Sequence, residues 1–474
     1  MKIKHPTSNA QRPTPNCVRC AGSLDVGCSM LDVGCSQNGS VLIIVLWIAI
    51  GLVSIALYFA NSMTYELRAS DNRASGLATE QAIEGAARYV RYVLATYATN
   101  GTVPATNLYV RAAVPVGDAR FWLIGRDPSG TPSAEPYFAL IDEGSKLNLN
   151  SATTNALSYL PNMTTDFAQA IVDWRSTNSS GTYALDYAQM GYQEKEAPFE
   201  TVDELRLVYG ATMDLLAGDD LNGNGVLDAN ETNSTGSSGV NHGLLEYTTV
   251  YTREPNFQAG GTTLTNVNTA SREDLQSLFE NAEVANAGLL AENLSAQIRS
   301  RPCAGMLDFC VRCKTLGMSS ADFAKIYDEV TTSTSAYIRG RLNVNTASAD
   351  VLTALLVGAG LDQNTASSTA QALITYRQQN PNNLTSIAWV VDALGNTGPA
   401  VRALARGDYL TTRSYQFTAD VAAVGPFGRG YRRVKFVFDT SNGAPQIIYR
   451  QDLSGLGWAL GEQARETWVA NTTP

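Results

Sequence analysis

The sequence predicts an α+β fold: a long N-terminal helix packed on a small antiparallel sheet, with a large all-α insertion within the sheet. Three observations predict it. The apolar run Ser40–Ala60 passes into amphipathic helical spacing, with no proline before Pro104. Segments with strand composition are confined to residues 101–146 and 413–474. The intervening segment, 147–412, repeats one short phrase three times.

Residues 1–39 form a polar leader that ends at Gly39, and 21 almost entirely apolar residues follow as a membrane segment, 40–60. At about 1.5 Å per residue, a helix of that length spans a bilayer core of roughly 30 Å. Four basic residues lie in the leader and two, Arg68 and Arg73, lie just beyond the run, which favours a cytoplasmic N-terminus and an external C-terminal domain. An ordinary signal anchor that holds a periplasmic domain is the alternative interpretation.

Helical spacing continues through residues 61–100. Apolar side chains recur there at steps of four and three, which places them on one face of a helix: Ile83, Ala87, Val90, Leu94 and Tyr97. One helix from about residue 41 to 99 would run roughly 90 Å. Its first part would lie in lipid and its second part on a globular domain.

Strand composition occurs at both ends of the globular part. Arg120–Gly125 and Tyr137–Asp142 are rich in aromatic and aliphatic residues and are separated by turn formers. Near the C-terminus, apolar and polar residues alternate in 415–421 and 434–438, and the Asn442-Gly443 pair predicts a hairpin turn into a further strand, Gln446–Tyr449. These segments predict a sheet whose first and last strands are far apart in the chain.

The chain is therefore expected to leave the sheet near Lys146 and to return near Arg413. The insertion between these points contains three copies of one phrase, Asn148–Ala152, Asn266–Ala270 and Asn343–Ala347. Each copy leads into an apolar helix and is followed by an aliphatic residue three before an arginine: Arg175, Arg301 and Arg377. Offsets that recur three times indicate a structural repeat. The Asn and Thr/Ser side chains of the phrase predict a turn with a helix N-cap.

The phrase resembles the helix-hairpin-helix repeat of competence-type DNA-binding proteins, whose Gly-x-Gly hairpin donates backbone N–H groups to phosphate. Only the third copy has a similar hairpin, Gly358-Ala-Gly360, and no lysine lies near it. We therefore interpret the repeats as a packing scaffold. A DNA-binding or DNA-uptake pilus component remains the alternative function.

A polar loop between the first two repeats matches the calcium-loop pattern D-x-[DN]-x-[DN]-G-x5-E at every specified position. Its expected ligands are Asp220, Asn222, Asn224, the Val226 carbonyl, Asp228 and Glu231. Carboxylate, amide and carbonyl oxygens suit a hard cation, and the glycine at the sixth position permits the sharp bend. The loop 220–231 is thus a candidate calcium site, and a solvated Asn/Gly turn is the alternative. Val202–Leu216 can supply an incoming helix, whereas Thr232–Gly239 does not predict an exiting one.

Charge and cysteine usage limit the chemistry of the mature part. The leader's four basic and two acidic residues, taken from 34 and 44, leave 30 basic and 42 acidic residues, a net charge of −12. Such a surface repels phosphate backbones, so no nucleic-acid partner is expected. Beyond the leader only His242 and three cysteines remain: Cys303, Cys310 and Cys313. A structural disulfide within this trio or buried thiols are the expected roles, and metal or redox chemistry is the alternative.

The junction at Gly39 resembles the prepilin signal of type IV pilins and type II secretion pseudopilins, in which a dedicated peptidase cuts after the glycine. Ser40 would then be the first mature residue. Most members of those families carry a glutamate at the fifth mature residue, where this chain has Ile44. The exception is the K-type minor pseudopilin (general secretion pathway protein K family), whose mature start also resembles Val41–Trp47.

The resemblance to K-type pseudopilins covers nearly all of the mature chain, including Asp142–Asn150, Asp173-Trp174, Phe199–Arg206 and the third phrase. It implies a pilin-like fold with a helical domain and bound calcium. It also implies an inner-membrane protein with a periplasmic C-terminal domain. The sequence contains no nucleophile elbow, histidine pair or Walker loop, so we do not expect an enzyme, and a membrane-anchored periplasmic enzyme is the alternative.

The same resemblance implies a place at the tip of the type II secretion pseudopilus. The implied partners are the other minor pseudopilins, the pseudopilus shaft and the prepilin peptidase. One departure concerns calcium: Ser176–Gly181 replaces an acidic run common in relatives, which argues against a second calcium site around Asp186 or Glu194.

Overall fold

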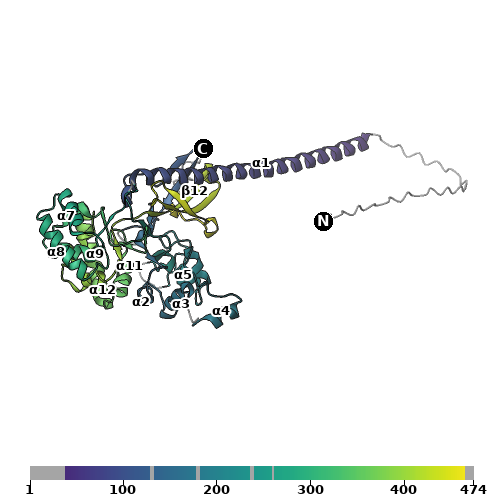
Figure 1. Cartoon of the computed structure of the whole chain (residues 1–474). Coiled ribbons are helices and arrows are strands. Elements are labelled where there is room, and N and C mark those ends of the chain that lie inside the picture. Colours follow the sequence, from purple (N-terminus) through teal and green to yellow (C-terminus); the bar gives the residue numbers. More distant parts are fainter. Residues whose placement is uncertain (1–37, 129–132, 178–181, 235–239, 259–260, 465–474) are drawn as a thin grey trace, which may run out of the picture. The chain divides into compact units, whose positions relative to one another are not determined.

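The computed structural model describes residues 38–128, 133–177, 182–234, 240–258 and 261–464. The chain divides into two units, Met1–Arg68 and Ala69–Pro474. Helix α1 runs from Asn38 to Tyr97 (Figure 1), so the predicted helix is confirmed to within a few residues at each end.

The first part of α1 has the exposure of a membrane span. Its large apolar side chains between Val41 and Leu67 are all more than half exposed. In the part of the chain that the structure describes, α1 is the one helix long and apolar enough to cross a membrane. The predicted apolar segment therefore lies on an exposed part of α1.

The second part of α1 packs on a sheet. The predicted helix face is confirmed, because Ile83, Ala87, Val90 and Leu94 are buried and Tyr97 is partly buried. They form one apolar cluster with side chains from three strands, introduced below: Phe121, Leu123, Phe417, Ala419, Val421, Ala423, Val434, Phe436 and Phe438.

The sheet is antiparallel and has the strand order β1-β2-β12-β13-β14, with the short β3 paired to β12. Its strands are β1 Val114–Val116, β2 Ala119–Ile124, β3 Ile141–Asp142, β12 Gln416–Val424, β13 Tyr431–Asp439 and β14 Gln446–Asp452. Three of the predicted strands are confirmed nearly in full, and the predicted Gln446–Tyr449 is confirmed within β14, but β1 was not predicted. The predicted strand Tyr137–Asp142 keeps only its last two residues and an isolated bridge from Phe138 to Ile124.

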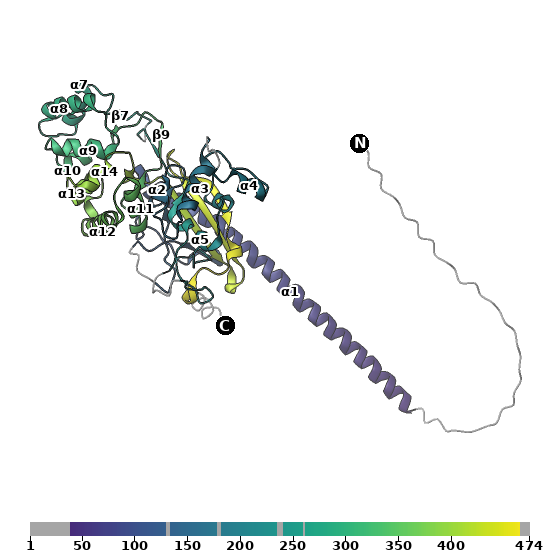
Figure 2. The same cartoon turned by 90° about the horizontal axis from the view of Figure 1, so that it is seen from below.

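The sheet is interrupted where the sequence predicted. Strand β3 ends at Asp142, and the chain next enters this sheet at Gln416. The helices between are α2 Thr154–Leu157, α3 Thr165–Arg175, α4 Ala184–Met190, α5 Met213–Leu216, α6 Leu244–Tyr247, α7 Arg272–Asn281, α8 Ala287–Ser300, α9 Met306–Thr315, α10 Ser320–Ile326, α11 Ala349–Gly358, α12 Gln363–Gln379, α13 Ala388–Leu394 and α14 Pro399–Leu404. Helices α2–α5 gather on one side and α7–α10 on the other, with α11 between them (Figures 1 and 2).

The insertion is not all-α, which corrects the prediction. It contains four pairs of short strands: β4 Leu147–Asn148 with β5 Thr248–Thr249, β7 Thr265–Asn266 with β8 Val330–Thr331, β10 Leu342–Asn343 with β11 Leu410–Thr411, and β6 Arg253–Pro255 with β9 Tyr337–Arg339. Strands of two or three residues are too short to show the alternation by which a strand is predicted.

Three of these pairs are parallel and begin at the repeated phrase. In each, the first asparagine of the phrase lies in a strand that pairs with residues at the far end of the same repeat. The side-chain oxygen of that asparagine accepts a hydrogen bond from the backbone N–H two residues on. The N-cap predicted within the phrase instead falls one residue after it, at Thr153, Ser271 and Ser348. The phrase therefore forms the turn, and the next residue caps the helix.

The second asparagine of each phrase fastens the turn to the rest of its repeat. Its side-chain amide donates to a carbonyl further along the same repeat: Asn150 to Phe199, Asn268 to Cys303 and Asn345 to Leu384. Arg175 and Arg377 add further bonds to phrase carbonyls, but Arg301 turns instead toward Asp308. The phrases thus connect the start of each repeat to its later segments by hydrogen bonds.

Candidate functional site

The loop that matched the calcium pattern is folded around its first carboxylate. Asp220 accepts two backbone hydrogen bonds, from Asn224 N at 3.0 Å and from Gly225 N at 2.7 Å. Gly225 has a φ of +88°, a conformation that favours glycine, so the bend expected at the sixth position is present. Asp220 and Asn224 are buried, which places the start of the loop inside the protein.

The two later carboxylates close the loop. Glu231 accepts from Asn222 N at 3.1 Å and from Asp228 N at 3.0 Å, so it spans the whole turn. Asp228 accepts from the side-chain amides of Asn222 and Asn224. Burial raises the pKa of Glu231, and repulsion from Asp220 and Asp228 raises it further. The hydrogen bonds from the backbone N–H groups of Asp228 and Asn222 oppose this rise. A cation among these carboxylates would relieve that repulsion.

The donor set of the loop suits a hard cation. Asn222 is buried, and its side-chain oxygen has no hydrogen-bond partner, which is costly for a buried acceptor unless a ligand meets it. Within the described residues, no group of three or more His, Cys, Asp or Glu side chains is placed to hold a metal ion. The fit therefore depends on asparagine and backbone oxygens together with the carboxylates, which is the chemistry of calcium loops.

The flanks of the loop differ from the prediction. Val202–Leu216 does not form one incoming helix, because it contains a 3-10 helix, Val202–Leu207, and a single α-helical turn, α5. The loop instead closes at its base through a bridge between Gly218 and His242. A Cβ on Gly218 would lie 2.1 Å from the Asn241 carbonyl, so only glycine permits this closure. Residues 232–234 are not helical, and 235–239 lie outside the described residues.

Two arginines hold the backbone of the loop from the sheet side. Arg433, on β13, donates to the carbonyls of Asn222 and Gly223. Arg126, just beyond β2, donates to the Gly223 carbonyl at 3.1 Å. Neither arginine could be predicted as part of the site, because no local motif links positions that are about 100 and 210 apart in the chain.

The three cysteines beyond the leader are buried free thiols, which is one of the two roles expected for them. Cys303, Cys310 and Cys313 are free and buried, and the latter two lie on α9. Burial raises the pKa of the Cys303 thiol to about 11 and raises that of the other two thiols further. Thiols held so strongly in the neutral form are poor nucleophiles and metal ligands.

The hairpin that suggested DNA binding has a packing role. Gly358 is the last residue of α11, and a Cβ there would lie 2.6 Å from the Cβ of Ala156. Asn155 also donates to the Val357 carbonyl at 3.0 Å. The glycine therefore permits close contact between α11 and α2, where a DNA-binding hairpin would need free N–H groups.

The cleavage junction lies at the start of α1. Gly39 and Ser40 are in its first turn, the leader to residue 37 lies outside the described residues, and Ile44 is 56% exposed. No measurement of processing bears on the junction, so cleavage after Gly39 stays a prediction.

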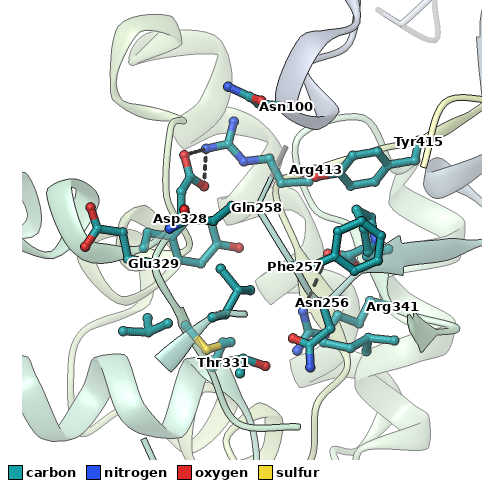
Figure 3. A pocket seen from close by; sticks show the side chains of 17 residues that line it. Asn100, Asn256, Phe257, Gln258, Asp328, Glu329, Thr331, Arg341, Arg413 and Tyr415 are labelled. Atoms are coloured by element: carbon teal, nitrogen blue, oxygen red, sulfur yellow. Dashed lines mark hydrogen bonds and ion pairs between the residues drawn. The ribbon is translucent and has the colours of Figure 1, made fainter. Parts of the chain in front are cut away.

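A separate cavity of about 400 Å³ lies where the insertion meets the return to the sheet (Figure 3). Arg413 donates from Nη2 to both carboxylate oxygens of Asp328 at 2.6 Å, and Arg341 lies between Glu254 and Asp408. None of the 17 described residues that line the cavity is a histidine, serine or cysteine.

No protein-family model and no curated protein matches the chain. A solved structure titled as the GspK-GspI-GspJ complex from the type 2 secretion system of enterotoxigenic Escherichia coli contains a similar chain. The similarity has 10% sequence identity and a TM-score of 0.40 and covers 82% of this chain and 99% of that chain. A similarity this distant carries no argument about function.

Proposed function

We propose that this protein is a minor pseudopilin of a type II secretion system and forms the tip of the pseudopilus. The observation that supports this proposal most strongly concerns α1, whose first part is exposed and apolar and whose second part packs on the sheet. Its apolar side chains are exposed up to Leu67, and from Ile83 they pack on an antiparallel sheet. This is the arrangement expected of a subunit anchored by its N-terminal helix, with the helix as the spine of a pilin-like domain.

The junction at Gly39 supports processing by a prepilin peptidase. A polar leader changes to an apolar helix at that bond. Cleavage would leave α1 at the extreme N-terminus of the mature protein, in the inner membrane. The globular part would then lie in the periplasm.

Two features favour a place at the tip. A carboxylate within a bilayer is costly unless it is paired, so a glutamate at the fifth mature position favours a neighbouring subunit that supplies a partner. Ile44 has no such requirement. The insertion adds residues 147–412 to one side of the sheet, and that bulk would obstruct another globular domain stacked above it. Other minor pseudopilins and the shaft are the expected partners, with helix-hairpin-helix-like repeats as a scaffold.

We also propose that the loop 220–231 binds calcium through Asp220, Asn222, Asn224, Asp228 and Glu231, with the Val226 carbonyl. The unpartnered Asn222 oxygen and the mutual repulsion of the carboxylates support this proposal. A divalent cation would neutralise the loop and hold its turn closed.

The tip assignment is tested by labelling and deletion. Immunogold labelling of assembled pseudopili should mark one end only. Deletion of the gene should reduce filament initiation or change filament length while shaft subunits can still polymerise. Labels spaced regularly along the shaft would contradict the tip position, and binding of DNA by the purified protein at moderate salt would favour the DNA-uptake alternative.

A further inference from the structure

The calcium loop has two sides with different partners. On one side of the loop, the side-chain amides of Asn222 and Asn224 converge on Asp228. Two of its backbone carbonyls, those of Asn222 and Gly223, point instead to Arg433 on the sheet. One short stretch of backbone therefore connects the proposed ion site with strand β13.

Arg433 is built into the sheet. Its side chain is 1% exposed and pairs with Asp420 of β12, with Nη2 and Oδ2 2.5 Å apart. The same guanidinium reaches the Gly223 carbonyl with Nη2 at 2.8 Å. A guanidinium has donors in a fixed fork, so it can hold a carboxylate and two carbonyls at once.

A second arginine repeats this arrangement. Arg126 donates to the Gly223 carbonyl, and its Nε lies 2.8 Å from Glu246 Oε1 on α6. Each arginine is thus paired with a carboxylate outside the loop. Neither arginine therefore places an uncompensated positive charge beside the proposed cation. The backbone at Asn222 and Gly223 is held from β13 and from the end of β2.

We propose that the loop is a latch, in which calcium fastens the helical insertion to the sheet through Arg433 and Arg126. This inference depends on the proposed calcium site. An ion that orders the side chains of Asp220, Asn222 and Asn224 also fixes the direction of the intervening carbonyls. The arginine contacts and the ion therefore stabilise one another, and the coupling acts equally in both directions.

Arg433 and Arg126 are positioning residues, since they act on the ion through the loop backbone. Loss of partners that orient metal ligands costs about 10- to 100-fold in metal affinity. Arg433→Lys keeps the charge but loses the fork, so it should weaken calcium binding about 10-fold. Arg432→Lys is the matched control, because the neighbouring Arg432 is 44% exposed and pairs with Asp452 at the surface.

The test uses the full chain in detergent, with calcium titrated by calorimetry and backbone hydrogen exchange measured with 5 mM calcium or with chelator. If Kd is about 10⁻⁴–10⁻³ M, backbone hydrogen exchange that requires the loop to separate from the sheet should slow by roughly 6- to 50-fold in 5 mM calcium. We expect that slowing in wild type within 119–128, 240–247 and 431–439 as well as in the loop, and none in α7 or α8.

The exchange experiment on wild type keeps the proposal testable if Arg433→Lys fails to fold. The latch is wrong if calcium binds but exchange slows only within 219–232, or if Arg433→Lys binds calcium as tightly as wild type. In that case the calcium site stands. Absence of any calcium binding by wild type would instead overturn the calcium site, and the latch with it.

Discussion

The two faces of strand β12 are both buried, but they are held in different ways. Phe417, Ala419, Val421 and Ala423 lie in the apolar cluster with α1. Shape and apolar area hold that face, because it carries no side chain that needs a hydrogen bond.

The other face of β12 bonds with the short segment that follows β3 and, through Arg433, with the insertion. Thr418 donates to Glu143 at 2.6 Å, and Asp420 pairs with Arg433, which reaches the calcium loop. Further along, Arg253 of the insertion pairs with Asp439 of β13. Here buried charges and hydrogen bonds fix the position of the insertion, so this face should be specific in geometry and sensitive to the loss of one partner.

The largest expected effect comes from breaking the polar face. Asp420→Ala leaves the Arg433 guanidinium buried without its carboxylate, and loss of one member of a buried pair costs about 3–5 kcal/mol of unfolding free energy. Urea unfolding of the full chain in detergent measures it. The control is Asp452→Ala, whose partner Arg432 is exposed, and it should cost about 0–1 kcal/mol. Equal costs for the two variants would mean that the polar face is not a buried charge network.

The neighbouring residue tests the apolar face. Val421 is fully buried on the opposite side of the same strand. Val421→Ala removes two methyl groups and leaves a small cavity, so it should cost roughly 2 kcal/mol in the same assay. It should not change the response to calcium. A calcium response that fell with Val421→Ala would show that the two faces are coupled and would weaken the comparison.

Buried carboxyl groups where the insertion meets the sheet should also make the stability of the protein depend on pH. Burial raises the pKa of Glu254, next to Arg253, to about 7 from its ordinary value of 4.5, although Arg341 opposes the rise. The folded state then holds a proton that the unfolded state releases. Stability from this group is complete below pH 4.5 and is lost as pH rises to about 7.

Relative to Glu254→Gln, wild type should therefore lose about 2 kcal/mol between pH 5 and pH 7.5. Thermal unfolding of both proteins across that range measures the difference. Parallel pH profiles for the two proteins would place the Glu254 pKa near its ordinary value. Val421→Ala should follow the wild-type profile, because the apolar face has no titrating group.

Calcium should give the smallest effect. If Kd is about 10⁻⁴–10⁻³ M, millimolar calcium adds on the order of 1 kcal/mol through mass action. Calcium should raise the melting temperature of wild type, and Asp220→Ala with Glu231→Ala should remove the increase. An equal increase in wild type and double variant would reduce the loop to a solvated turn.

The two faces also differ in how far the sequence predicts them. Alternation at Phe417, Ala419 and Val421 predicts a strand with one apolar face, and the helix spacing at Ile83 and Val90 predicts what covers it. Both signals are local, because they depend only on period. The structure confirms them.

Nothing local marks the other face as buried. Thr418 and Asp420 resemble the solvent-facing residues of a half-buried strand. Thr418 bonds with Glu143, and Asp420 pairs with Arg433, which bonds with Asn222. Glu143 and Asn222 lie about 200 to 280 residues away in the chain from the strand. The calcium loop could be predicted because its ligands occupy twelve consecutive positions. Its attachment through Arg126 and Arg433 could not, and neither could the two-residue strands that close each repeat.

The central claim, that α1 is the spine of a processed pilin-like subunit, is tested most directly at its N-terminus. Mass spectrometry of the protein extracted from membranes of a type II secreting cell should find a mature chain that begins at Ser40. Gly39→Ala should leave the leader attached. A mature protein that still began at Met1, or one cut beyond Ala60, would contradict the account.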